Sequence, residues 1–154
     1  MSLPGVWSAP SAVAVGTGFV ECRRLTFHKP SKDGSGKCDA QATENEGDRV
    51  HGVVFKININ DKPSLDRAEG LGHGYEEETL QVVMNDSTIS AIAYIATKRD
   101  RALSPYRWYK ALTVAGAVEH GLPTSYVEWL RAIESVEDLD PIRRAENEAM
   151  LFAS

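Results

Sequence analysis

The hydrophobic pattern of the sequence changes its period near residue 100, and this change limits the folds that the chain can adopt. Before that point, short apolar runs alternate with turn segments such as HKPSKDGSG and ENEGD, a pattern typical of strands. After it, apolar residues recur at helical spacing, for example Trp108, Leu112 and Ala115. Strands followed by helices predict an α+β fold.

Five strands are expected in the first part of the chain. They are residues 20–27, 37–43, 49–57, 75–84 and 88–97. The apolar run GVVFKI indicates that the third strand is buried, and Asn85-Asp86-Ser87 suits a tight turn between the last two. The sheet is expected to be largely antiparallel, and Gly16-Thr17-Gly18 is expected to form a bend between strands.

Helices are expected at four places. They are residues 63–69, 104–121, 123–133 and 141–152. Pro63 is tolerated in a first helical turn, and Gly70 is placed to end the first helix in a left-handed conformation. Asp140 followed by Pro141 is a suitable start for the last helix.

Length and charge narrow the function classes. With 154 residues, residues 1–154 are expected to form a single domain, and residues 136–154 a C-terminal helical extension of it. The 17 Lys and Arg against 22 Asp and Glu give a formal net charge of −5 without a basic stripe, so nucleic acid and anionic membranes are poor candidate partners. The short apolar runs and the lack of a signal-peptide pattern indicate a soluble cytoplasmic protein.

The usual signatures of cofactor, metal and nucleophile sites are missing from the sequence. DGSGK lacks the residues of a phosphate loop, and the glycines of residues 70–74 do not match the dinucleotide fingerprint. The four histidines lack metal-ligand spacing, and no GxSxG elbow is present. We therefore expect no cofactor and no metal, and we expect Cys22 and Cys38 to be free thiols.

The stretch SLDRAEGLGHGYEEETL contains a candidate acid/base residue, Glu69. At 100° per residue, Glu69 lies about 40° from Leu65 and close to Ala68, on the face expected to turn inward, whereas Asp66 and Arg67 point elsewhere. The negative end of the helix dipole and partial burial would both raise the pKa of this carboxyl. The alternative is a helix-end glutamate that bends into solvent or bonds the amides of the glycine turn.

Several motifs in a fixed order give the chain a family resemblance. The order of GVVFKI, LDRAEG, a Gly-Tyr that begins a strand, AYIAT and SPYRWYKALTVAGAVEHGLP resembles the γ-glutamylcyclotransferase family, including its many uncharacterised bacterial members. The similarity runs from about residue 10 to about residue 133. It implies a small mixed, largely antiparallel β-barrel with flanking helices. It also implies cyclisation of a γ-glutamyl amine or γ-glutamyl amino acid to 5-oxoproline with release of the amine.

The resemblance also implies a set of site residues. The Glu of the LDxxEG motif, Glu69, corresponds to the catalytic acid/base, and Tyr75, Tyr94 and Tyr109 correspond to residues that surround the substrate. Tyr94 could instead be ordinary sheet packing, and Tyr109 a core aromatic residue with a satisfied hydroxyl. The residue types suit the reaction: the substrate's own α-amine attacks its γ-carbonyl, so one carboxyl that takes and returns a proton is sufficient.

One family feature is missing from the sequence. The family begins with an aromatic-rich strand ending in YGSN, whose amides hold the substrate, and no such motif occurs here. An upstream gene start, trimming of the chain or true loss of the loop would each explain this, and the pocket is then expected to be open on that side. Three interpretations follow: an active cyclotransferase whose native chain is longer, a non-catalytic binding module, or a homodimer that covers an open sheet edge.

Overall fold

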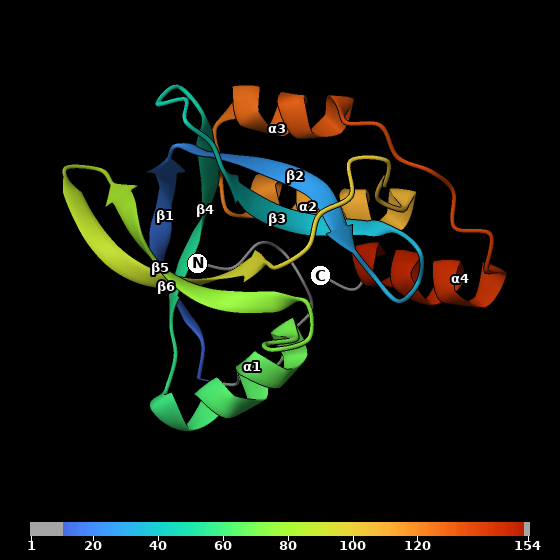
Figure 1. Ribbon diagram of the computed structural model, residues 1–154, viewed down its shortest axis with the longest axis horizontal. Helices are drawn as coiled ribbons and strands as arrows, with labels where there is room; N and C mark the ends of the chain where they lie inside the picture. Colours follow the sequence, from blue (N-terminus) through green and yellow to red (C-terminus); the bar gives the residue numbers. More distant parts are fainter. Residues whose placement is uncertain (1–10, 153–154) are drawn as a thin grey trace.

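The computed structural model describes residues 11–152, which form an α+β fold (Figure 1). The strands are β1 (Val13–Glu21), β2 (Arg23–Pro30), β3 (Gly36–Ala42), β4 (Arg49–Lys56), β5 (Tyr75–Met84) and β6 (Ser87–Ala96). The helices are α1 (Lys62–Glu69), α2 (Arg107–Glu119), α3 (Thr124–Ala132) and α4 (Pro141–Ala149), with short 3₁₀ helices at Ile59–Asp61 and Met150–Phe152. The predicted order of strands before helices, interrupted by α1, is confirmed.

The strands form two antiparallel sheets. The larger sheet has the order β4-β1-β5-β6, and β2 and β3 form a separate pair. β1 pairs with β4 from Val13 opposite Lys56 to Glu21 opposite Arg49, but it pairs with β5 only where Phe19 lies opposite Val83. The largely antiparallel α+β architecture is therefore as predicted, although the hydrogen-bonded strands of residues 11–152 do not close into a complete barrel.

A buried carboxylate links the β2–β3 pair to the larger sheet. The Asp39 side chain is fully buried on β3, and it accepts hydrogen bonds from the backbone N–H of Ala96 at 2.9 Å and from Nε of Arg99 at 2.5 Å. Because a buried charge is costly unless it is paired, these two bonds stabilise the contact between β3 and the end of β6.

The predicted strand 20–27 is wrong in one respect, because it spans the corner between two strands. Cys22 lies at this corner with a φ of 57°, in the left-handed region. Its N–H donates to the carbonyl of Asp48 at 3.0 Å, and its own carbonyl accepts from the N–H of Thr43 at 2.8 Å. These bonds compensate for a conformation that a cysteine seldom adopts.

The predicted bend at Gly16-Thr17-Gly18 is also wrong, because these residues lie inside β1. All three are paired with β4, next to a register irregularity between Ala14 and Gly16. A Cβ atom at Gly18 would lie 2.6 Å from the carbonyl oxygen of Val83. Glycine is therefore required for the close approach of β1 to β5 rather than for a turn.

The turn predicted between β5 and β6 is confirmed. Met84 pairs with Ser87, so the connection consists of Asn85 and Asp86. Asn85 has a φ of 49°, a conformation that asparagine tolerates better than most residues.

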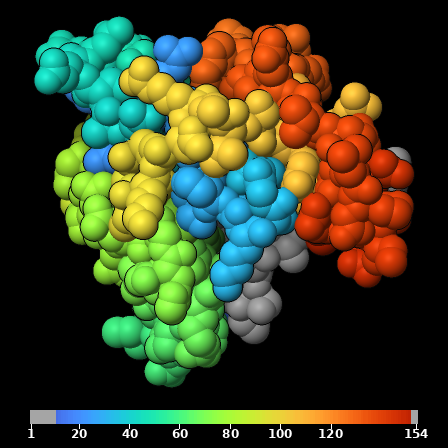
Figure 2. All heavy atoms as spheres, turned by 45° about the vertical axis from the view of Figure 1, so that its right-hand side comes forward, coloured from blue at the N-terminus to red at the C-terminus, as the bar shows by residue number. Residues whose placement is uncertain are grey.

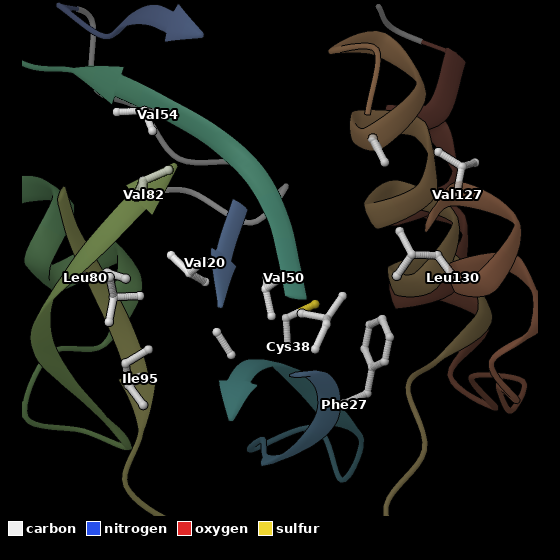
Figure 3. Close-up of a cluster of buried hydrophobic side chains, with 14 residues drawn as sticks. Val20, Phe27, Cys38, Val50, Val54, Leu80, Val82, Ile95, Val127 and Leu130 are labelled. Carbon is white, nitrogen blue, oxygen red and sulfur yellow. The ribbon is translucent and has the colours of Figure 1, made fainter. Parts of the chain in front are cut away.

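The core lies between the strands and the helices α2 and α3 (Figure 3). Buried side chains from the strands include Val20, Val50, Val82 and Ile95, and they share one cluster with Leu130 of α3. Leu130 is only 1% exposed, so its replacement by alanine would cost ~2–5 kcal/mol of unfolding free energy.

Asp138 fastens α4 to α2. The buried Asp138 carboxylate accepts hydrogen bonds from Nε1 of Trp108 at 2.9 Å, and from Nε and a terminal nitrogen of Arg143 at 2.7 and 2.6 Å. The hydrogen bonds from Arg143 hold the pKa of Asp138 well below its usual range. Asp140 begins α4 by accepting from the N–H groups of Ile142 and Arg143, as expected for a helix N-cap.

Among residues 11–152, no helix is both long enough and apolar enough to cross a membrane.

Candidate active site

The helix α1 and the turn that follows it position Glu69. Pro63 lies in the first helical turn, and Gly70 ends the helix with a φ of 76°, as predicted. The N–H of Leu71 then donates to the carbonyl of Asp66 at 2.9 Å. Glu69 is thus the last residue of a helix whose end is fixed by a left-handed glycine.

Glu69 lines a cavity of about 470 Å³ between α1 and the strands β4 and β6. The walls are mostly apolar and include Val54, Phe55, Leu65 and Ile92, with polar groups from Lys62, Ser90 and Tyr94. The volume falls within the range of small-molecule sites, and predominantly apolar walls with a few polar groups are typical of them.

Burial raises the pKa of the Glu69 carboxyl, and acid/base chemistry needs a carboxyl with a raised pKa. The side chain is half-buried, and desolvation raises its pKa above the ordinary value of 4.5. Among the described residues near α1, Lys62 forms ion pairs with Asp66 and Glu77 and not with Glu69. A carboxyl with a raised pKa can hold a proton and release it closer to neutral pH than an exposed one can.

The inward face of α1 differs from the helical-wheel expectation. Ala68 is exposed, whereas Asp66, which was expected to point away, lies against β6. Its Oδ1 accepts hydrogen bonds from the hydroxyl of Tyr94 and from Nζ of Lys62, each at 2.5 Å. Lys62 also bonds Glu77 of β5. The cluster of Lys62, Asp66, Glu77 and Tyr94 fastens α1 to the hairpin of β5 and β6.

Three groups of this cluster, Lys62, Asp66 and Tyr94, shift each other's pKa values. Desolvation opposes the charge on Asp66, but the hydrogen bonds from Lys62 and Tyr94 outweigh it and lower the pKa of Asp66. Burial, and then the bond to Asp66, raises the pKa of Tyr94 well above its usual range. Although desolvation acts in the opposite direction, the bonds to Asp66 and Glu77 raise the pKa of Lys62. At neutral pH, Lys62 is therefore an ammonium and Tyr94 a neutral phenol on the cavity wall, and Asp66 beside them is a carboxylate.

Tyr75 and Tyr109 meet at the backbone of Cys38 on β3. The hydroxyl of Tyr75 donates to the carbonyl of Cys38 at 2.8 Å, and the hydroxyl of Tyr109 accepts from the N–H of Cys38 at 3.2 Å. Tyr109 also packs edge-on against Phe27, with ring centroids 6.0 Å apart. Both hydroxyls are therefore bonded to the strand backbone.

Burial dominates the titration of this second cluster. Desolvation raises the pKa of Tyr75 and of Tyr109 well above the usual range, and the negative charge of Glu69 adds to the shift at Tyr75. Desolvation also raises the pKa of the Cys38 thiol to about 11. This thiol therefore remains protonated at neutral pH and is a poor nucleophile.

The structure thus brings two of the four predicted site residues into one cavity. Glu69 and Tyr94 line it, and Tyr75 lies close enough to Glu69 that the negative charge of Glu69 helps to raise the pKa of Tyr75. Tyr109 is held on β3 by Cys38 and is not part of this cavity wall. Reasoning from the sequence missed Lys62 and Asp66; their spacing of four residues, which suits a helical ion pair, was the signal available.

The part of the chain that the structure describes contains no group of three or more His, Cys, Asp or Glu residues that could hold a metal ion.

This geometry defines a class of protein, namely small α+β proteins that hold one titratable carboxyl group in an apolar cavity. A sequence profile of the AIG2-like family matches residues 49–130, which include β4, α1, the glycine turn and the helices α2 and α3 up to Leu130. The chain belongs to this family, and the resemblance to γ-glutamylcyclotransferases is confirmed by its relatives.

The chain is similar to proteins named γ-glutamylcyclotransferase from several mammals. It is 34% identical to the human protein over 117 residues, which is 70% of this chain and 62% of the human one. It is 32% identical to the bovine protein over 130 residues, which is 81% of this chain and 69% of the bovine one. The chain thus spans less than two thirds of the length of the human relative.

The fold is also similar to a solved structure. A protein named γ-glutamyl cyclotransferase superposes with a TM-score of 0.83 at 28% identity, covering 94% of this chain and 88% of the other. The similarity extends over nearly all of both chains, so the α+β architecture is that of this fold.

Proposed function

We propose that this protein cyclises a γ-glutamyl amine or γ-glutamyl amino acid to 5-oxoproline, with Glu69 as the general acid/base. The observation that carries the proposal is the half-buried Glu69 carboxyl, whose pKa is raised by desolvation where it lines a cavity of small-molecule size. The similarity to proteins named γ-glutamylcyclotransferase supports the same reaction class.

Two protons leave the α-nitrogen during the reaction. Ionised Glu69 takes the first from the α-ammonium of the substrate, and the freed amine attacks the γ-carbonyl carbon to form the ring C–N bond. The protonated Glu69 then donates this proton to the leaving nitrogen as the original amide C–N bond breaks. The ring nitrogen releases its second proton to the departing amine, so the products are 5-oxoproline and the amine as an ammonium ion, and one carboxyl serves as base and then as acid.

The substrate supplies most of the proximity. Its amine and carbonyl belong to one molecule, and closures of this kind reach effective molarities of ~10⁵ M or more. The protein's contribution is to hold the γ-glutamyl chain in a folded conformation and to exclude water. The apolar walls around Glu69 serve the second role, and the Tyr94 hydroxyl on the cavity wall orients polar groups of the substrate without adding charge.

The test is release of 5-oxoproline from a panel of γ-glutamyl amino acids and γ-glutamylamines. Glu69→Gln should lower kcat by ~10²–10⁴-fold while ligand binding and the circular dichroism spectrum stay nearly unchanged, because the amide keeps the shape but cannot exchange the proton. The matched control is Glu76→Gln, which removes an exposed carboxylate on β5 and should leave turnover unchanged.

Two outcomes would contradict the proposal in different ways. Full turnover by Glu69→Gln would exclude this residue as the acid/base. Binding of γ-glutamyl compounds without any 5-oxoproline across the panel would favour a non-catalytic binding module. The assay should include a chain extended upstream if the gene encodes a YGSN strand there, because amide donors to an oxyanion are worth ~10²-fold or more each.

A further inference from the structure

The cavity that contains Glu69 extends along the helix α1. Glu69 is the last residue of this helix, Leu65 lies about one turn earlier, and Lys62 and Ile59 line the cavity at the other end of the helix. The helical rise of about 1.5 Å per residue separates Lys62 from Glu69 by roughly 10 Å along the axis. Figure 2 shows the green residues of α1 at the lower end of the molecule, beside yellow-green residues of the β5–β6 hairpin. A ligand that reacts at Glu69 can therefore extend along α1.

The side chains along this length of the cavity are mostly apolar. Leu65 and Ile59 line it on the side of α1, Ile57 follows the end of β4, and Ala91 belongs to β6. Ile59 is 83% exposed, so it lies at the mouth of the cavity. A ligand group that enters here gains free energy in proportion to the apolar surface that it removes from water.

The polar side chains of the same walls already have partners. Lys62 is the one cationic residue among the described residues that line the cavity, and it bonds Asp66 and Glu77. The hydroxyl of Tyr94 donates to Asp66 at 2.5 Å, and the hydroxyl of Ser90 accepts from a side chain of the neighbouring strand at 2.9 Å. A carboxylate in this part of the cavity would meet the negative charge of Asp66 without a free cation beside it. Burial of a carboxylate without a partner is costly.

We propose that the leaving amine of the preferred substrate carries an apolar, uncharged substituent, so that the substrate is a γ-glutamylamine rather than a γ-glutamyl amino acid. This inference rests on the proposed function, because that function places the scissile amide at Glu69. The substituent then lies along α1 toward Leu65 and Ile59. A γ-glutamyl amino acid carries an additional carboxylate on the carbon next to the leaving nitrogen, and this carboxylate enters the same apolar length. The γ-glutamyl part is common to both classes and does not distinguish them.

The test compares substrates that differ only in this carboxylate. γ-Glutamyl-isoamylamine and γ-glutamyl-leucine have the same branched substituent, and kcat/KM should be at least about tenfold higher for the amine compound. In a series of linear γ-glutamylalkylamines, each added methylene should raise kcat/KM by about fourfold until the cavity is filled.

Ile59→Arg should shift this preference toward the amino acid. Because Ile59 is exposed at the mouth, the replacement places a guanidinium there without opening the core, and a guanidinium binds carboxylates. The ratio of kcat/KM for γ-glutamyl-leucine to that for γ-glutamyl-isoamylamine should rise by roughly tenfold. The matched control is Ile142→Arg, which changes a 71% exposed residue of α4 outside the cavity and should leave the ratio unchanged.

Binding to the Glu69→Gln variant separates this inference from the proposed function. Calorimetric titration of this variant should give a Kd at least about tenfold lower for γ-glutamyl-isoamylamine than for γ-glutamyl-leucine. If the natural chain releases no 5-oxoproline from any compound, the proposed function fails, but the order of the two affinities still tests the selectivity. The inference is overturned if γ-glutamyl-leucine binds as tightly or more tightly, if neither compound binds, or if Ile142→Arg shifts the preference as much as Ile59→Arg does.

Discussion

The hydroxyl of Tyr94 on β6 lies 2.5 Å from Oδ1 of Asp66 on α1, and this bond joins the helix that ends at Glu69 to the opposite wall of the cavity. Asp66 also binds Lys62, one helical turn earlier. The position of Glu69 therefore depends on a polar cluster as well as on the glycine turn.

We expect Tyr94→Phe and Asp66→Asn to have non-additive effects on stability. Tyr94→Phe should lower the unfolding free energy by about 1 kcal/mol, and Asp66→Asn should cost more because Lys62 also loses its carboxylate. The double variant should cost less than the sum of the two by at least about 0.5 kcal/mol. Urea denaturation of the four proteins measures this, and simple additivity would show that the bond contributes nothing.

Glu69 should make stability depend on pH. Its pKa is raised in the folded protein relative to the ordinary 4.5, so the folded state favours the protonated form. Protonated Glu69 stabilises the folded state. This stabilisation is complete below the ordinary pKa and is lost as the pH rises through the pKa of Glu69 in the folded protein. Glu69→Gln, which cannot ionise, should therefore gain stability relative to the natural chain as the pH rises from 4 to 8. A difference that stays constant over this range would mean that Glu69 is not desolvated.

The two tyrosines that share Cys38 should differ in their effects. Tyr109→Phe leaves the N–H of Cys38 without a described partner beside the irregular part of the β2–β3 pair, so it should cost ~1–3 kcal/mol of unfolding free energy. Tyr75→Phe removes only a donor from a carbonyl that can accept elsewhere, so its cost should be smaller. Thermal unfolding of both variants tests this order, and the reverse order would contradict it.

We expect the docking of α4 on α2 to depend on Asp138. Asp138→Asn removes the charge that binds Arg143, and the amide cannot accept at both oxygen positions. Hydrogen exchange in Pro141–Ala149 should become faster. The control is Asp140→Asn, which should change little because asparagine caps helices about as well as aspartate does. Equal exchange in the two variants would show that Asp138 does not fasten the helix.

Much of the fold could be predicted because the local signals agree with the structure. Gly70 and Asn85 occupy the left-handed positions where glycine and asparagine are expected, and both turns were predicted correctly. Cys22 occupies a left-handed position that no local pattern indicates, so the corner between β1 and β2 was missed. A bend was predicted at Gly16-Thr17-Gly18, because the local sequence does not show that these glycines closely approach another strand.

The site was predicted only in part for a related reason. The orientation of Glu69 follows from helix periodicity and the resemblance, and both refer to residues near it in sequence. The partners of Asp66 come from β5 and β6, so their position depends on how α1 docks on that hairpin. The tyrosine roles rest on the resemblance, and they and the homodimer, one of the three interpretations, stay predictions.

The pairing of β1 with β4 has a consequence for how quickly the chain can fold. The β2–β3 and β5–β6 hairpins join neighbours in sequence, whereas Val13 must find Lys56 across the whole β2–β3 unit. Closing such a long loop costs entropy before the contacts that compensate for it have formed, so topologies with many pairings between distant residues fold slowly. The rate-limiting barrier should therefore be crossed when β1 joins β4, after the two hairpins have formed, which would leave the edge of β4 briefly open to intermolecular association during refolding.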